Sequence, residues 1–161
     1  MSDGIGNRGM VVAGDLFGPL KMLHFDLGPE EATFLLVDHP DRSADLLAAH
    51  QQAQLDLVRQ MANCGVPAMM AMDNLDTMFH SPRYVEQCSA SFYEQASRIC
   101  HEHGSTFFIH ACGQQRANLK LIASLGVDGL EGVASPPLGD VELDDAIAAT
   151  GDRFILTGGI S

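Results

Sequence analysis

The sequence predicts an α/β fold, a parallel β/α (TIM-type) barrel that is incomplete. Short apolar segments alternate with amphipathic helical patterns, which is typical of a parallel sheet covered by helices. Five such apolar segments occur in 161 residues. A closed eight-stranded barrel normally takes about 250 residues. We therefore expect one partial-barrel domain over residues 1–161, with about five strands and covering helices.

The first part of the chain contains one predicted strand and three predicted helices. The apolar run MVVAG predicts a strand at residues 10–14, which the loop DLFGP follows. Pro29 stands at the favoured first turn of one helix. An apolar stripe runs along the longest helix, which Gly65 ends. We expect these helices at residues 20–25, 29–37 and 41–63.

The second part continues with four predicted strands and three predicted helices. TFFIH is the clearest strand, whereas Ala and Met in PAMMAM favour helices and only the flanking turn residues indicate a strand. Ser81 is the predicted N-cap of one helix, and Gly126 closes another. We expect strands at residues 67–72, 106–110, 127–131 and 154–157, and helices at residues 82–103, 114–125 and 143–150.

Composition and charge exclude several classes of protein. The net charge is −12 and the basic residues are scattered, so no basic cluster is available for nucleic-acid phosphates. The polar start lacks the apolar core of a signal peptide, and the longest apolar run is too short to span a bilayer. Four cysteines without a CxxC motif argue against a disulfide framework. We expect a cytoplasmic protein that binds neither nucleic acid nor membranes.

The most specific chemical feature is His110-Ala111-Cys112-Gly113, at the end of the clearest strand. Side chains two residues apart on a strand point the same way, so an imidazole and a thiolate can face one point and form half of a zinc site. A buried cysteine beside a hydrogen-bonded histidine is the alternative. Glu131, on the next strand, is the best third ligand, although it could be a solvated rim residue. These three ligands would leave one open position, as in catalytic zinc sites.

Polar residues also follow the other predicted strands, at the edge where parallel β/α folds collect functional groups. Asp73 and Asp76 are candidate catalytic residues that could orient substrate or accept a proton. The candidate substrate-binding residues at these strand ends are Asp15, Asn74, Gly158 and Gly159. Asp15 and Asp73 could instead cap turns. Gly158-Gly159 resembles a barrel phosphate loop, but paired glycines more often serve a tight turn.

Three segments resemble the uroporphyrinogen decarboxylase superfamily: GDLFGPLKMLHFDLG, CGVPAMMAMDNLDTMFHSPRYVEQ and FFIHACGQQRANLKLIASLGVDGLE. That family is a β/α barrel. It includes the decarboxylases and zinc-dependent methyltransferases that act on methylated corrinoids. The H-x-C pattern is similar to the methyltransferase branch, in which the His and Cys bind zinc, and the resemblance implies that role for His110 and Cys112. In that branch a further cysteine ligand comes from near the C-terminus of the family, beyond the segments matched here.

The resemblance implies transfer of a methyl group from a methylated corrinoid to a thiol, with zinc lowering the pKa of the thiol. It also implies a small-molecule substrate and a corrinoid protein as partner. An alternative is metal-free decarboxylation of a tetrapyrrole such as uroporphyrinogen, with Asp73 handling protons. The arginine-bearing segment that grips its carboxylates has no match here, and the net charge of −12 disfavours such a substrate.

A third alternative is a non-catalytic partial barrel that serves as a binding or assembly module. Five strands would leave two open sheet edges, and open edges recruit partners. We therefore expect a homo-oligomer.

Overall fold

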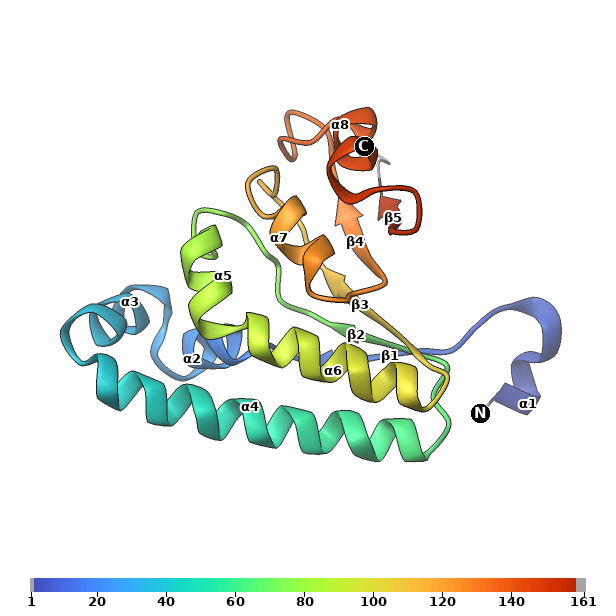
Figure 1. Cartoon of the computed structure of the whole chain (residues 1–161), viewed down its shortest axis with the longest axis horizontal. Coiled ribbons are helices and arrows are strands. Elements are labelled where there is room, and N and C mark those ends of the chain that lie inside the picture. The colour runs from blue at the N-terminus through green and yellow to red at the C-terminus, as the bar shows by residue number, and fades with distance from the viewer. Residues whose placement is uncertain (1, 159–161) are drawn as a thin grey trace.

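The computed structural model describes residues 2–158, which form one five-stranded parallel sheet with covering helices (Figure 1). The strands are β1 (Val12–Leu16), β2 (Ala68–Ala71), β3 (Thr106–His110), β4 (Gly129–Val133) and β5 (Ile155–Gly158). They neighbour one another in chain order, and every neighbouring pair is parallel. In a β/α barrel the strands follow one another around the sheet in chain order, whereas in a doubly wound sheet the strand order reverses at a switch point. The expected fold class, a partial parallel β/α barrel, is confirmed.

Helices connect the successive strands. Between β1 and β2 lie α2 (Pro19–Leu27), α3 (Pro29–Asp38) and α4 (Pro40–Asn63), and between β2 and β3 lie α5 (Pro82–Cys88) and α6 (Ala90–Glu102). The connections after β3 and β4 contain α7 (Leu119–Ser124) and α8 (Leu143–Thr150). Ahead of β1, α1 (Ser2–Ile5) and the 3-10 helix η1 (Gly6–Arg8) lie apart from the sheet (Figure 1). None of the helices in residues 2–158 is long and apolar enough to cross a membrane.

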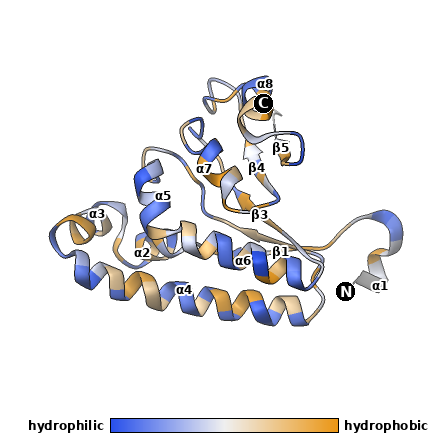
Figure 2. Cartoon of the chain, viewed as in Figure 1, coloured by the Kyte–Doolittle hydropathy of each residue, from blue (hydrophilic) through white to orange (hydrophobic). Residues whose placement is uncertain are grey.

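The hydrophobic core lies between the sheet and the helix pair α4 and α6, which pack side by side (Figure 1). Strand side chains alternate between two faces: Met69, Phe107 and Ile109 are buried on the helix side, whereas Met70 and Phe108 are half-buried on the other. The covering helices are correspondingly amphipathic, with apolar and polar residues alternating along α4 (Figure 2). The half-buried face is the one that lines the interior of a closed barrel.

β1 and β5 form the two edges of the sheet, since each pairs with a single described neighbour. Their apolar side chains are more exposed than those of the central strands: Val12 is 44% exposed and Ile155 is 45% exposed. Open edges carry backbone groups that can pair with another chain. The expected self-association stays a prediction.

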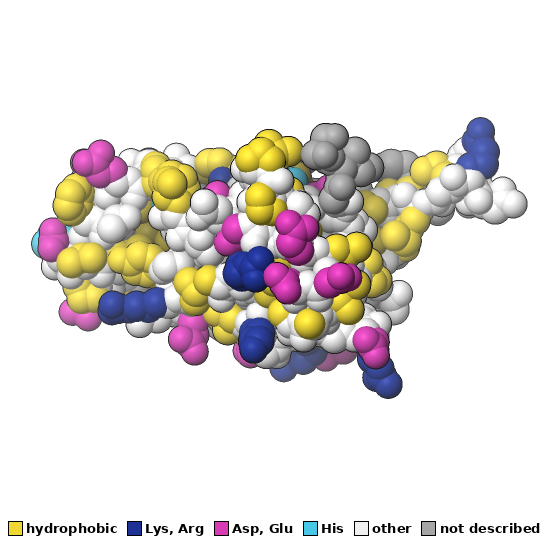
Figure 3. Space-filling view, turned by 90° about the horizontal axis from the view of Figure 1, so that it is seen from above, with side chains coloured by type: hydrophobic (Ala, Val, Ile, Leu, Met, Phe, Trp, Pro, Cys, Tyr) yellow, Lys and Arg dark blue, Asp and Glu magenta, His cyan; other side chains and the backbone are white. Residues whose placement is uncertain are grey.

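Charged side chains of both signs share the surface. On the face in Figure 3, basic side chains lie beside acidic ones, with apolar side chains between them. Arg116 and Asp145 form one such exposed pair, with Nη1 and Oδ2 2.8 Å apart. Exposed pairs contribute about 0–1 kcal/mol each, so the fold depends mainly on its apolar core.

The single helix expected at residues 82–103 is two helices, and Ser89 separates them. Its φ of −130° and ψ of −20° leave the helical region. The Ser89 N–H donates a hydrogen bond to the Val85 carbonyl at the end of α5. The Ser89 carbonyl accepts a hydrogen bond from the Tyr93 N–H at the start of α6. The α2 N-terminus packs on this point, since a Cβ added at Gly18 would lie 3.3 Å from Ser89 Oγ. The break thus coincides with a tertiary contact, and no proline or glycine marks it in the sequence.

The helix expected from residue 114 begins instead at Leu119. The N–H groups of Gln115 and Arg116 donate to Asp140 Oδ1, at 2.6 Å and 3.1 Å. This carboxylate belongs to the loop after β4, and the turn at residues 116–118 follows these bonds and leads into α7. Strands β1 and β4 also begin and end later than expected.

Candidate active site

The segments that follow β2 and β3 are bonded to each other at the carboxyl edge of the sheet. The Asn74 N–H donates to the His110 carbonyl at 3.0 Å, and the Thr77 N–H donates to the Gln114 carbonyl at 2.8 Å. Asn74 has a φ of +50°, a left-handed conformation that asparagine tolerates better than most residues. These bonds place three expected strand-end residues, Asn74, Asp76 and Cys112, around one cavity.

Asp76 joins the two segments through its carboxylate. Oδ1 accepts from the Met78 N–H at 2.8 Å, and Oδ2 accepts from the Gln114 N–H at 3.1 Å. Gly113, with a φ of +85°, lies so close that an added Cβ would overlap the Asp76 carboxylate. Only a glycine therefore fits beside Asp76 without moving it. Asp76 lines the cavity, but both of its oxygens are already engaged by backbone N–H groups.

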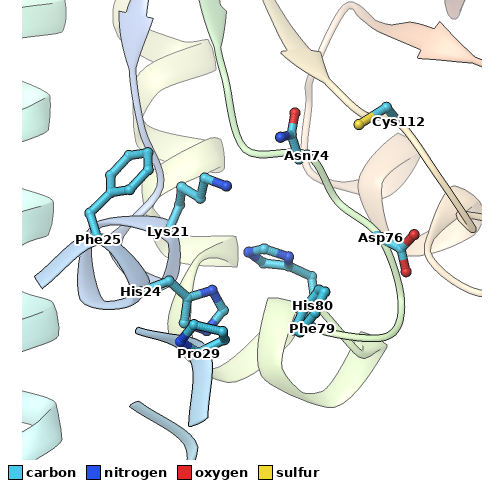
Figure 4. Close-up of a pocket in the computed structure, with 9 residues that line it drawn as sticks. All are labelled: Lys21, His24, Phe25, Pro29, Asn74, Asp76, Phe79, His80 and Cys112. Carbon is cyan, nitrogen blue, oxygen red and sulfur yellow. The ribbon is translucent and has the colours of Figure 1, made fainter. Parts of the chain in front are cut away.

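The cavity has a volume of about 380 Å³ and lies between α2, the start of α3 and the segments after β2 and β3 (Figure 4). Its lining residues are Lys21, His24, Phe25, Pro29, Asn74, Asp76, Phe79, His80 and Cys112. Two aromatic side chains give it an apolar part, and Lys21 and the two histidines give it a basic part. The Cys112 thiol is exposed. A cavity of this size and mixed polarity suits a small molecule.

His80 and His24 pack edge to face in the wall of the cavity, with ring centroids 5.1 Å apart. His80 is only 3% exposed, and its burial, with His24 and Lys21 nearby, lowers its pKa to about 3. Burial and Lys21 also lower the pKa of His24. Both imidazoles are therefore expected to be neutral at pH 7. These residues and Lys21 were not expected from the sequence, because no spacing pattern marks them.

His110 is paired with Glu131 on the neighbouring strand. The two residues are opposite each other in the β3–β4 register, and His110 Nδ1 forms a hydrogen bond with Glu131 Oε2. A carboxylate accepts this bond, so the pairing favours the tautomer with the proton on Nδ1 and a lone pair on Nε2. Carboxylates commonly orient metal-binding histidines in this way. Glu131, expected as a third zinc ligand beside His110, is thus in hydrogen-bond contact with the His110 imidazole.

The donor set fits only part of a zinc site. His110 and Cys112 supply one nitrogen and one sulfur donor, and zinc usually takes four ligands. Within residues 2–158, no group of three or more His, Cys, Asp or Glu side chains is arranged to hold a metal ion. A zinc ion bound by His110 and Cys112 would therefore require ligands from outside the described residues.

Asp73 faces the protein interior. It is 1% exposed, and its carboxylate accepts hydrogen bonds from the Gly18 N–H at 2.7 Å and from the Tyr93 hydroxyl. Burial raises the pKa of Asp73 to about 6, although the Tyr93 and Gly18 hydrogen bonds and Lys21 oppose this rise. The carboxyl ties the end of β2 to the N-terminus of α2 and to α6. These contacts favour a structural role over direct action on a substrate.

The remaining expected residues do not line this cavity. Asp15 is exposed on β1, with a φ of +62° at a register shift between β1 and β2. Gly158 lines a separate cavity of about 280 Å³ beside Val133 and Glu142. An added Cβ at Gly158 would overlap the Val133 backbone, so close strand packing accounts for this glycine. Gly159 lies outside the described residues.

A sequential parallel β/α sheet with a cavity of mixed polarity at the carboxyl ends of its strands defines a barrel-type protein with a strand-end site. The chain belongs to the uroporphyrinogen decarboxylase (URO-D) family, whose model matches residues 7–161. This confirms the resemblance seen in the sequence.

A solved structure described as a methyltransferase from Methanosarcina mazei has a similar fold. The TM-score is 0.78 and the sequence identity is 19%, over 99% of this chain and 45% of that one. The chain thus spans less than half the length of that methyltransferase, and this likeness shows the fold alone. No curated protein sequence gives a significant match.

Proposed function

We propose that this chain carries the strand-end site of a methyltransferase that moves a methyl group from a methylated corrinoid to a thiol with the help of zinc. The observation that carries the proposal is the His110-x-Cys112 pair at the end of β3, with His110 hydrogen-bonded to Glu131. This set offers an imidazole nitrogen and a cysteine sulfur, which are ligand atoms that zinc prefers. The methyltransferase with a similar fold adds support.

Each residue has a distinct role in this proposal. His110 Nε2 and the Cys112 thiolate would hold zinc, and the contact with His110 favours an orienting role for Glu131 over ligation. When bound, zinc would lower the pKa of the acceptor thiol. In the reaction, a sulfur–carbon bond forms as the cobalt–carbon bond breaks. The bonding electrons stay on cobalt, and the thiol proton is released.

The neighbouring cavity would hold the small-molecule acceptor, because Cys112 lines it. Phe79, also in its lining, and the adjacent Met78 are 48% and 76% exposed, which would suit contact with a corrinoid or its carrier protein. Strands from a second copy would cover the sheet edges at β1 and β5, so a homo-oligomer is part of the proposal.

Zinc binding tests the proposal directly. We expect the chain to take up zinc in competition with a chromophoric chelator, and His110→Ala and Cys112→Ser to weaken binding by at least about tenfold each. Cys64→Ser is the matched control, since Cys64 is also an exposed free thiol. Equal zinc binding by Cys112→Ser and Cys64→Ser would overturn the proposed ligand set.

Methyl transfer from methylcobalamin to a small thiol, followed by the corrinoid absorbance, tests the reaction. We expect it to require zinc, His110 and Cys112. Release of CO₂ from a tetrapyrrole acid without metal would instead favour the decarboxylase alternative. Binding of a partner without either reaction would favour the assembly module.

A further inference from the structure

Lys21 brings a positive charge to the cavity that has no ion-pair partner among the described residues. It is one of two lysines in a chain of net charge −12. Among the described residues, no carboxylate lies within ion-pair distance of its ammonium group, which sits 5.1 Å from the centroid of the Phe25 ring. The nearby Asp76 carboxylate points away from Lys21 (Figure 4) and accepts two backbone N–H groups.

His80 brings a buried hydrogen-bonding group without a partner. Its side chain lines the cavity, is 3% exposed, and has no hydrogen-bond partner for either ring nitrogen within the described residues. A neutral imidazole has one N–H donor and one acceptor nitrogen. Buried polar groups in native proteins are nearly always hydrogen-bonded, and leaving one unpaired costs about 1–3 kcal/mol. An unpaired buried ring beside a free ammonium group therefore indicates a ligand position.

We propose that this cavity binds the oxyanion group of a small molecule, a carboxylate, phosphate or sulfonate, between the Lys21 ammonium and a ring N–H of His80. The ammonium group would attract the negative charge of the oxyanion, and the imidazole N–H would donate a hydrogen bond to one of its oxygens and so fix its orientation. Phe25 and Phe79 offer apolar walls for the rest of the molecule. This inference goes beyond the proposed function, because it does not depend on zinc or on which reaction takes place at the cavity.

Cys112 lies in the lining of the same cavity and so provides a chemical reporter. Iodoacetate and iodoacetamide alkylate a thiolate by the same displacement of iodide, but only iodoacetate carries a carboxylate. The ratio of their rates at one thiol cancels the thiolate fraction and leaves the effect of the carboxylate. An oxyanion subsite should raise this ratio at Cys112.

The experiment measures both rates at each cysteine by mass spectrometry, in zinc-free buffer so that the outcome does not depend on metal. Cys64 is the internal control, since it is exposed at the end of α4 and is absent from the cavity lining. We expect the ratio at Cys112 to exceed that at Cys64 by about tenfold or more, and inorganic phosphate to suppress the excess.

Two matched pairs of variants identify the residues responsible for the effect. Lys21→Met should bring the Cys112 ratio within about twofold of the Cys64 ratio, whereas Lys120→Met, which removes the same charge from exposed α7, should leave it unchanged. His80→Gln, which keeps an N–H donor, should retain more of the excess than His80→Leu. Equal ratios at Cys112 and Cys64 in the wild type, or an excess that survives Lys21→Met, would overturn the proposal.

Discussion

Replacing Asp73 with asparagine should make the stability of this protein less dependent on pH. The folded chain buries Asp73 completely and raises its pKa from 3.8 to about 6. Because the folded state then binds the proton more tightly than the unfolded state does, this carboxyl favours folding most below about pH 4. That contribution is lost as the pH rises to about 6.

The size of the effect follows from the two pKa values. The rise from 3.8 to about 6 corresponds to about 3 kcal/mol of folding free energy, lost between about pH 4 and pH 7. An asparagine has no proton to lose. Its carbonyl can accept from the Gly18 N–H and its amide can donate to the Tyr93 oxygen, so the local bonds can persist.

Urea unfolding at a series of pH values measures the difference. We expect the free energy of unfolding of Asp73→Asn, relative to wild type, to rise by about 3 kcal/mol from pH 4 to pH 7. Asp45→Asn, on the exposed side of α4, removes the same charge and should show little of this trend. A difference between Asp73→Asn and wild type that stays constant with pH would refute the reasoning.

Two further substitutions probe the supports of the site. Gly113→Ala should destabilise the fold by about 2–3 kcal/mol in urea unfolding, because its Cβ would displace Asp76. Gly151→Ala, which shares a positive φ but has open space around it, should cost only about 1 kcal/mol, and equal losses would exclude the clash with Asp76. Tyr93→Phe removes a donor to Asp73, so the pKa of Asp73, followed by NMR, should rise further. An unchanged pKa would show that the hydroxyl does not stabilise the carboxylate.

The succession of strands and helices and the class of fold were predictable because they depend on local patterns. Alternating apolar and amphipathic segments required no knowledge of distant contacts. Ser89 shows the limit of such patterns. At this break Ser89 lies against Gly18, the N-cap of α2, which is far away in the sequence, and neither proline nor glycine marks the break locally. The bond from Gln115 to Asp140 is also non-local, spanning 25 residues.

The candidate site was partly predictable for the same reason. Parallel strands end at one edge, so Asn74, Asp76 and Cys112 were expected near one another. Lys21 and His80 were not, because their meeting depends on how α2 packs against the segment before α5. The net charge of −12 gave no indication of them either, because the charge of the whole chain does not show whether the charge in one cavity is positive or negative.

The bonds between the segments after β2 and β3 also restrict motion around the cavity. Thr77 and Gln114 are joined through backbone groups, and Asp76 adds a side-chain bond to Gln114. Neither segment can open without breaking all of these bonds at once, so the two behave as one cooperative unit. Because Phe79 and Cys112 in the cavity lining are themselves exposed, a small molecule can enter without either segment opening.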